Sequence, residues 1–292
     1  MAKDIKHYTI GVDIGGTKMS GVLFDGEKVL ADYTLATPQD NLEHFLIMLK
    51  AVVEPLLEKS TRDKVTVKGL GIGVAGPLDR NSQIILNPPN IKILNKVNLV
   101  EQLKNKFNYS VKIDNDVNCF VRAEALLGAG QKYSNIFGLT IGTGIGGGWW
   151  YNGGIYTGSH AVTQPAWQII DATNGLSLEQ VYQKLLQNSP AASAEEAYRG
   201  DVLAQKIYEE FGRYLGITLA NMVNLIDPEV IIIGGGVVES SDLFLAKTKK
   251  VMRQFILSPE ARKVKIIKGK LGPLAGAIGA ALLVNNNSLS NP

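Results

Sequence analysis

The chain has 292 residues, of which 45% are hydrophobic and 20% are charged, and its formal net charge is +3. This composition is that of an ordinary globular protein, long enough for one large domain or two smaller ones with their own cores. The small net charge, without a dense Lys/Arg block, argues against a nucleic-acid-binding surface. The single cysteine, Cys119, excludes internal disulfides and a cysteine-rich zinc site, and it fits a reducing compartment.

The chain carries no signal for a membrane. Its charged start, M-A-K-D-I-K-H-Y, is unlike a signal peptide, and no run reaches the roughly 18 apolar residues that a membrane span needs. The tail at 286–292 has too little apolar surface to fold, so we expect it to be frayed. We therefore expect a cytoplasmic protein that binds neither membrane nor nucleic acid.

Hydrophobic periodicity predicts strands and helices that alternate along the chain. In chain order the predicted elements are strands around a glycine turn at 8–24, a strand at 28–36, a helix at 41–59, strands at 65–74 and 111–113, a helix at 117–127, a strand at 135–141, a hairpin at 148–156, helices at 177–186 and 201–225, a strand at 230–233 and a helix at 274–284. Strand, glycine turn and strand occur near residue 10 and again near residue 140. This echo predicts a duplicated α/β architecture with a ligand cleft between its halves.

Two glycine-rich turns follow apolar runs, at Ile10–Lys18 (I-G-V-D-I-G-G-T-K) and at Leu139–Gly148 (L-T-I-G-T-G-I-G-G-G). Glycine and small hydroxyl residues after a strand let backbone N–H groups approach an anion without a Cβ in the way. The first turn also carries an acid, Asp13, and each turn carries a threonine. The two turns together predict a cleft that holds a polyphosphate from two sides, as in a nucleotide-binding protein.

Further segments complete an ordered set that covers most of the chain. They are D-I-G-G-T-K at 13–18, G-I-G-V-A-G-P-L-D at 71–79 with P-P-N at 88–90, D-N-D-V-N at 114–118, the second glycine turn, N-L-I-D-P-E-V-I-I-I-G-G-G at 224–236 and L-G-P-L-A-G-A-I-G-A-A at 271–281. The set resembles the ROK family of sugar kinases. The resemblance implies an α/β protein with the two-lobed actin-like ATPase (ribonuclease H-like) fold and a ligand cleft between the lobes. Residues 1–116 with 274–285 would form the smaller lobe, and 117–273 the larger.

The resemblance also implies ATP and Mg²⁺. Phosphoryl transfer depends on positioning and charge neutralisation more than on covalent work by the protein. The groups expected to hold the phosphates are the backbone N–H groups of Gly15, Gly16, Thr17, Gly142, Thr143 and Gly144, with Lys18 in the same motif. A third glycine turn, Gly234, Gly235 and Gly236, would let adenine and ribose lie flat against the backbone. Without a ligand it would be a plain strand-to-helix turn.

Two aspartates are assigned to chemistry. Asp13 lies beside the expected phosphates, which requires a cation between the two charges, so we assign it to Mg²⁺, through water. The alternative is an aspartate that stabilises its own turn. Asp116 matches the catalytic aspartate of the family and is the candidate general base; the alternative is an N-cap for the helix that follows. Asn115 is expected to hold neighbouring sugar hydroxyls, and Glu124 to orient structure.

The sugar side departs from the family pattern. The family carries G-E-x-G-H after the second phosphate loop, with Glu and His touching the sugar, whereas this chain reads Gln164-Pro165-Ala166-Trp167-Gln168. Gln164 and Gln168 could supply amide hydrogen bonds, and Trp167 could stack on the apolar face of a sugar. The family's zinc site uses that His and three Cys, so no zinc site is expected here. His160, upstream, is expected to be a loop histidine.

Two further residues match sugar-contacting positions of the family. Asn90 matches a sugar-contacting asparagine, and would otherwise belong to a plain turn. Ser177-Leu178-Glu179 aligns with the family's G-C-x-E motif, so Glu179 is expected on the sugar, and would otherwise be an exposed helix residue. The phosphate-binding half of the motif set is thus complete, while the sugar-binding half is altered.

The leading hypothesis is an ATP-dependent kinase that phosphorylates a hydroxyl of a hexose or an amino sugar. The alternative is a catalytically impaired pseudokinase that senses sugar or nucleotide. Polyphosphate as donor stays open, although the 224–236 segment favours a nucleoside. A DNA-binding repressor of the same family would need a helix-turn-helix module before the kinase domain, and we expect none because only residues 1–7 precede the first strand. The family also implies a homodimer.

Overall fold

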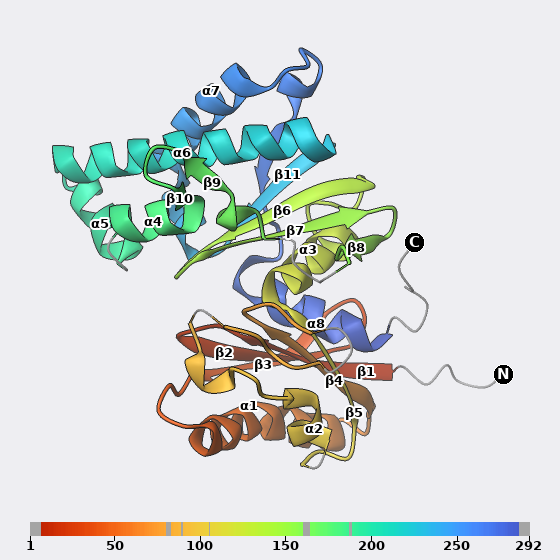
Figure 1. Cartoon of the computed structure of the whole chain (residues 1–292). Helices are drawn as coiled ribbons and strands as arrows, with labels where there is room; N and C mark the ends of the chain where they lie inside the picture. The colour runs from red at the N-terminus through yellow and green to blue at the C-terminus, as the bar shows by residue number, and fades with distance from the viewer. Residues whose placement is uncertain are drawn as a thin grey trace.

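The computed structural model describes residues 7–79, 83–88, 90–104, 106–159, 164–186 and 189–285. Figure 1 shows two lobes, one above the other, each built on a twisted sheet. The tail at 286–292, for which we predicted fraying, and His160 lie outside the described residues.

The lower lobe contains β1 (His7–Ile14), β2 (Lys18–Phe24), β3 (Val29–Ala36), β4 (Thr66–Val74) and β5 (Ser110–Asn115) with α1 (Leu42–Arg62), α2 (Leu99–Lys104) and α8 (Ala275–Asn285). The upper lobe contains β6 (Asn135–Ile141), β7 (Ile145–Tyr151), β8 (Gly154–Tyr156), β11 (Val230–Gly234) and β12 (Lys265–Lys268) with α3 (Asp116–Leu127), α4 (Leu178–Leu186), α5 (Pro190–Tyr198), α6 (Val202–Ile226) and α7 (Leu245–Phe255). A small sheet of β9 (Ile169–Asp171) and β10 (Leu176–Ser177) precedes α4.

The two main sheets share one topology. Their strand orders are β3-β2-β1-β4-β5 and β8-β7-β6-β11-β12. In each, three consecutive strands form an antiparallel meander, and two later strands add in parallel beside its first strand. This equivalence confirms the duplicated α/β architecture that the sequence predicts. Because β1 and β6 hold equivalent places, the two glycine turns that follow them occupy equivalent positions, one in each lobe.

Helices α3 and α8 lie between the two sheets (Figure 1). Small residues allow α8 to approach its neighbours closely. A Cβ on Gly71 of β4 would lie 1.8 Å from the carbonyl oxygen of Ala280, and one on Gly279 would lie 1.7 Å from that of Cys119 in α3. Helix α8 thus packs on β4 of the lower sheet and on α3 at once, and its grouping with the first lobe stays a prediction. Helix α3 also reaches the lower sheet, where a Cβ on Gly73 of β4 would lie 3.2 Å from Cys119 Sγ, so both helices join the lobes.

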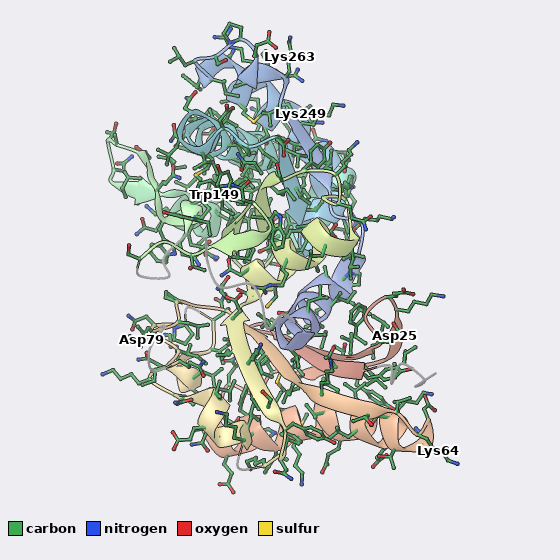
Figure 2. The ribbon with its side chains drawn as sticks, turned by 90° about the vertical axis from the view of Figure 1, so that its right-hand side faces the viewer. Asp25, Lys64, Asp79, Trp149, Lys249 and Lys263 are labelled. Carbon is green, nitrogen blue, oxygen red and sulfur yellow. The ribbon has the colours of Figure 1, made fainter. Side chains whose placement is uncertain are left out.

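Each lobe has its own hydrophobic core. Phe45 and Leu49 of α1 pack with Ile72 of β4 beneath the lower sheet. Phe137 of β6 and Phe211 of α6 belong to the larger upper core, which α4 to α7 cover. The charged side chains labelled in Figure 2, such as those of Lys64 and Lys263, lie on the outside of the lobes.

Sequence periodicity finds the longest elements and misses several shorter ones. The predicted helices at 41–59 and 201–225 are observed as α1 and α6, with Asn41 and Asp201 as their N-caps. No element is predicted for α2, α5, α7 or β12. The glycines at 146–148, predicted to belong to the second turn, lie in β7 instead. Gly146 and Gly148 face α3, where a Cβ on Gly146 would lie 2.3 Å from Val117, and Gly147 faces Pro165 on the other side of the strand.

None of the helices in the described part of the chain combines the length and the apolar character that crossing a bilayer requires.

The close crossing of α3 and α8 predicts a large cost for one added methyl group. We expect Gly279→Ala to lower the free energy of unfolding by about 1–3 kcal/mol, because its Cβ would overlap the Cys119 carbonyl and force the helices apart. Urea denaturation measures the change. The matched control is Gly154→Ala, where a Cβ meets nothing within 4 Å. Equal stability of the two variants would contradict the packing described.

Candidate active site

A cavity of about 620 Å³ lies where the two lobes meet. Both glycine turns, the β5–α3 junction and α4 contribute to its wall. The predicted site residues on this wall are Gly15, Gly16, Asn90, Asn115, Asp116, Gly142, Thr143, Gly144, Gln164, Glu179 and Gly235. Segments separated by more than a hundred residues in sequence thus meet around one space, as the duplicated architecture predicts.

A second cavity, of about 480 Å³, adjoins the first. The two cavities share Asp116, Thr140 and Gly235. Its remaining wall comes from the third glycine turn, the loop after β12, the start of α8 and the α3 residues Phe120 and Glu124, together with Asp13 and Lys18. Asp116 therefore faces two neighbouring spaces, one on the side of Asn90 and Glu179 and one on the side of the third glycine turn.

The first glycine turn is fixed by hydrogen bonds from the segment after β3. Thr37 Oγ1 donates to the Gly15 carbonyl at 2.7 Å, and Gln39 Nε2 donates to the Gly16 carbonyl at 2.6 Å. The Gly15 N–H donates to the Lys18 carbonyl, so this group is committed within the turn. The N–H groups of Gly16 and Thr17 have no acceptor among the described residues.

The second glycine turn is held by α4. Glu179 Oε2 accepts from the Ile145 N–H at 2.7 Å, the Tyr182 hydroxyl donates to the Gly142 carbonyl, and Gln183 Nε2 donates to the Thr143 carbonyl at 2.8 Å. The Gly142 N–H donates within the turn to Gly144. The sequence prediction for the N–H groups of Gly15 and Gly142 is therefore corrected: turn formation already uses both.

The third glycine turn has a structural reason for each of its first two glycines. Gly235 has φ of +90°, and a Cβ there would lie 2.3 Å from the Ile141 carbonyl oxygen. A Cβ on Gly234 would lie 2.4 Å from the Phe120 ring. Gly236 has open space around it and lines the second cavity. Close packing thus accounts for Gly234 and Gly235, while the open space at Gly236 leaves room for a ligand.

One carboxylate oxygen of Asp13 has no protein partner among the described residues. Its Oδ1 is buried and accepts no hydrogen bond among the described residues. Gly276, at the start of α8, lies so close that a Cβ there would be 2.4 Å from Asp13 Oδ2. Burial raises the pKa of Asp13 from its usual 3.8 to about 7; the charge of Asp116 adds to the rise, and Lys18 opposes it. A buried, unpartnered carboxylate is costly to ionise, so Asp13 needs either a bound proton or a neighbouring cation.

Asp116 is the first residue of α3. Asn115, not Asp116, is the N-cap: its Oδ1 accepts from the N–H groups of Val117 and Asn118. The capping alternative for Asp116 is therefore wrong, although Oδ1 of Asp116 does accept from Val117 at 2.9 Å. Burial raises the pKa of Asp116 to about 6, and Asp114 adds to the rise. A carboxylate with such a pKa is suited to accept a proton near neutral pH.

The β5–α3 junction is held by a buried ion pair that sequence reasoning missed. Arg122 donates to Asp114 Oδ2 at 2.5 Å, and Asn118 Nδ2 donates to Asp114 Oδ1 at 2.9 Å. Arg122 is a charged residue on the buried face of an apolar helix, which is the signal that could have revealed it. The structural role predicted for Glu124 is observed. Glu124 accepts from three backbone N–H groups, of Ala129, Lys270 and Leu271. It thus fastens α3 to the loop that leads to α8.

Asn115 and Glu179 both line the first cavity while performing structural work. Besides capping α3, Asn115 uses Nδ2 to donate to the Gly76 carbonyl at 3.2 Å. Glu179 accepts from Gln183 at 2.9 Å as well as from the second glycine turn. Each side chain is therefore held in a fixed orientation on the cavity wall.

The segment Gln164–Gln168 divides between the cavity and the protein interior. Gln164 and Trp167 line the first cavity. Pro165 packs against β7, where a Cβ on Gly147 would lie 2.2 Å from its ring. Gln168 Nε2 instead donates to the Met222 sulfur, so the structure directs this side chain toward α6. Gln168 is therefore not brought together with the other predicted sugar-contacting residues; it follows the turn Pro165–Trp167, and its partners Met222 and Asn221 are on α6.

Among the described residues, Asp13 is the carboxylate on the cavity walls that has a buried oxygen without a hydrogen-bond partner. Among the described residues there is no cluster of three or more His, Cys, Asp or Glu side chains that could enclose a metal ion. A Mg²⁺ ion bound here would take one carboxylate from the protein and its remaining ligands from phosphate and water, which is a common arrangement for this ion. The unpartnered Oδ1 of Asp13 fits that role.

The sequence and the fold are both similar to those of known sugar kinases. The ROK family model matches residues 9–164 and 171–287. A glucokinase of Thermotoga maritima is 28% identical, with 94% of this chain and 96% of that protein covered. An N-acetyl-D-glucosamine kinase of Mannheimia succiniciproducens is also 28% identical, with 94% and 98% covered. A glucokinase structure from Streptomyces griseus, in complex with glucose and AMPPNP, superimposes with a TM-score of 0.80 at 28% identity, covering 94% of this chain and 98% of that one. The predicted actin-like ATPase fold is thereby confirmed.

The protonation of Asp13 predicts a pH-dependent difference in stability. The folded protein keeps this proton up to about pH 7, whereas the unfolded chain releases it near 3.8, so stability is full below 3.8 and falls as pH rises through 7. Asn removes the buried charge. We expect Asp13→Asn to exceed the wild type by roughly 2–4 kcal/mol at pH 8 without Mg²⁺ and to match it near pH 4. Urea denaturation at both pH values tests this; a variant no more stable at pH 8 would refute it.

Proposed function

The chain belongs to the ROK family, and on that footing we propose that it is an ATP-dependent sugar kinase with Asp116 as general base. The observation that carries the proposal is the position of Asp116 on the wall shared by two cavities. A base that takes the proton of the acceptor hydroxyl must lie within hydrogen-bond reach of that hydroxyl, close to where the acceptor space meets the donor space. The space beside Asn90 and Glu179 suits the sugar, and the space beside the third glycine turn suits the nucleotide.

The reaction follows from this placement. A sugar hydroxyl oxygen attacks the γ-phosphorus, and the bond from that phosphorus to the β,γ-bridging oxygen breaks. The electron pair of the broken bond leaves with ADP. Asp116 takes the hydroxyl proton, and the products are a sugar phosphate ester and ADP. The protein contributes mainly by orienting the two substrates and by neutralising charge.

The phosphates are assigned to the two opposed glycine turns. Gly16, Thr17, Thr143 and Gly144 would supply the backbone N–H groups that remain available. Gly16, Thr143 and Gly144 lie on the wall of the first cavity, so the phosphates would extend from the second cavity into the first. The hydrogen bonds to Thr37 and α4 keep both turns rigid, so little conformational entropy is lost when phosphate binds. Mg²⁺ would supply the positively charged partner that the Asp13 carboxylate lacks among the described residues. The third glycine turn favours a nucleoside, and hence ATP, over polyphosphate as donor.

The acceptor is assigned to the class of hexoses and amino sugars, in line with the activities named for the relatives. Asn90, Asn115, Gln164 and Glu179 line the cavity that would receive it. Their amides and carboxylate offer both donors and acceptors to hydroxyl groups. Homodimer assembly and a cytoplasmic location stay predictions from the sequence.

Replacement of the base should abolish turnover. We expect Asp116→Asn to lower kcat by about 10²–10⁴-fold in an assay coupled to ADP release, across a panel of hexoses and N-acetylated amino sugars. Nucleotide affinity, measured by calorimetry with a non-hydrolysable ATP analogue, should change little. Asp32→Asn, on the exposed face of the edge strand β3, is the matched control. Nucleotide binding by the wild type without turnover on any sugar would instead establish a pseudokinase.

The raised pKa of Asp116 predicts the pH profile. The base works only when deprotonated, so log kcat/KM for the sugar should bend near pH 6 and fall by about one unit per pH unit below it. The profile should be measured at saturating Mg²⁺ and ATP. A profile that stays flat down to pH 4.5 would show that Asp116 titrates as an ordinary solvated carboxylate or does not act as the base.

A further inference from the structure

One end of the upper lobe carries a concentration of positive charge. Residues 247–270 contain nine Lys or Arg residues and one acid, Glu260, whereas the net charge of the whole chain is +3. The remainder of the chain is therefore net acidic. Helix α7 lies at the end of the upper lobe that is farthest from the lower lobe (Figure 1), and Lys249 and Lys263 both lie at this end in Figure 2. The small net charge of the chain thus hides a strongly basic region.

The basic side chains of α7 lie away from its packed face. Helix α7 packs on α6, where a Cβ on Gly216 would lie 2.7 Å from the carbonyl oxygen of Thr248. At about 100° per residue, Lys250 and Arg253 lie on the opposite side of the helix, where both are exposed, and Lys249 beside them is partly exposed. None of the three forms an ion pair within the described part of the chain. Their charge is therefore available to a partner.

The segment after α7 adds more basic side chains to the same surface. Arg262 Nε donates to the Ile256 carbonyl at 2.8 Å, which holds the 3₁₀ turn Ala261–Lys263 (η4) against the end of α7. Glu260 pairs with Lys263, but both side chains are more than 70% exposed, so water screens this pair. We call the following six residues the basic face: Lys249, Lys250, Arg253, Arg262, Lys263 and Lys265.

A protruding apolar group lies beside the basic face. Leu257 and Leu225, with 86% and 76% of their surfaces exposed, are the two most exposed large apolar side chains in the described residues. Asn224 joins their segments: its Nδ2 donates to the Phe255 carbonyl, and its Oδ1 accepts from the Leu257 N–H, both at 2.9 Å. Phe255 is itself 57% exposed. We call Leu225, Phe255 and Leu257 the apolar tip, which these hydrogen bonds hold in place.

The combination of the two features selects the kind of partner. Exposed aliphatic side chains next to basic ones match a surface that has anionic headgroups over hydrocarbon. A nucleic acid would satisfy the charge but offers nothing to the two leucines, since proteins bind its bases through aromatic stacking and polar contacts. A second protein is disfavoured by size, because three protruding side chains cover only a fraction of the roughly 800 Å² that each partner buries in a stable interface.

We propose that the basic face and the apolar tip form a docking surface for a membrane that contains anionic phospholipids. The apolar tip enters the boundary between headgroups and acyl chains, and the basic face contacts the lipid phosphates. Docking of this kind needs no spanning helix. It revises the sequence prediction that the chain binds no membrane, which rested on the lack of a spanning run and of a signal peptide. The cleft with Asp116 lies between the lobes, away from this surface, so the inference is independent of the proposed function.

Vesicle sedimentation of the wild type tests the electrostatic part. We expect vesicles of phosphatidylcholine with about 30% phosphatidylglycerol to bind at least about tenfold more tightly than vesicles of phosphatidylcholine alone. The difference should disappear between about 0.05 M and about 0.5 M NaCl, because salt screens the attraction between exposed charges. This part of the test needs no variant, so it stands whether or not the variants below fold.

Charge reversal locates the binding surface. Reversal of the three basic residues of α7 should weaken binding to the anionic vesicles by at least about tenfold. The matched control reverses three exposed lysines of the lower lobe and changes the net charge equally. The two variants are Lys249→Glu/Lys250→Glu/Arg253→Glu and Lys28→Glu/Lys64→Glu/Lys68→Glu.

The apolar tip is tested by substitution of Leu257. We expect Leu257→Ser to weaken binding to the anionic vesicles by about fivefold or more, because the apolar contact with the acyl chains is lost. Leu203→Ser is the matched control, since Leu203 is 69% exposed at the other end of α6. In Leu257→Trp, phospholipids brominated on their acyl chains should quench the added indole, whereas the indole added in Leu203→Trp should not be quenched.

Each outcome decides the question. Binding to anionic vesicles that the α7 charge reversal and Leu257→Ser both weaken, with both controls unchanged, supports the proposal. Equal binding to the two kinds of vesicle, no binding at low salt, or an equal loss in the controls overturns it. Binding to a short DNA duplex without binding to anionic vesicles would show a nucleic-acid surface instead. A dimer in gel filtration that Leu257→Ser dissociates would show an interface between two copies, and either of these results also overturns the proposal.

Discussion

The structure depends on the burial of two carboxylates, Asp13 and Asp116, where the lobes meet. Burial makes the ionised form of each carboxyl unfavourable and raises both pKa values. Each carboxyl therefore binds a proton or a neighbouring cation more readily than an exposed one. Asp13 comes from the end of β1 and Asp116 from the start of α3, so the two acids come from elements that meet between the two sheets (Figure 1). Under the proposed function, a cation-bound polyphosphate would satisfy Asp13, and the proton of an attacking hydroxyl would satisfy Asp116. The proposed function is the chemistry that this arrangement makes favourable.

The surrounding packing serves to hold that pair. The small residues of α8 let it lie between the lower sheet and α3, which brings Gly276 against Asp13. Arg122 neutralises Asp114, so the β5–α3 junction carries one unpaired acid, Asp116, rather than two. Glu124 ties the far end of α3 to the loop before α8 through backbone N–H groups. These contacts stiffen the junction, and the anchored glycine turns extend that rigidity to the proposed phosphate sites.

Much of this could be predicted from sequence because it has local signals. Glycine turns after apolar strands, the acid in the first turn and the helix at 117–127 all follow from short-range patterns, and the repeat of one pattern indicated two similar lobes. Roles that depend on tertiary contact could not be read in this way. The commitment of the Gly15 N–H to its own turn, the clamp from α4 and the direction of Gln168 toward Met222 involve partners that only folding brings together. The ion pair of Arg122 was missed for the same reason.

Titration of the Asp13 carboxyl by ¹³C NMR tests the central claim most directly. In the wild type without Mg²⁺, we predict a pKa near 7, which falls in Asp116→Asn because the neighbouring charge is gone. Mg²⁺ with a non-hydrolysable ATP analogue should lower it further, since the cation favours the ionised form. A pKa near 3.8 that neither Asp116→Asn nor the Mg²⁺–nucleotide complex changes would contradict the account, because the two acids would then be solvated and independent.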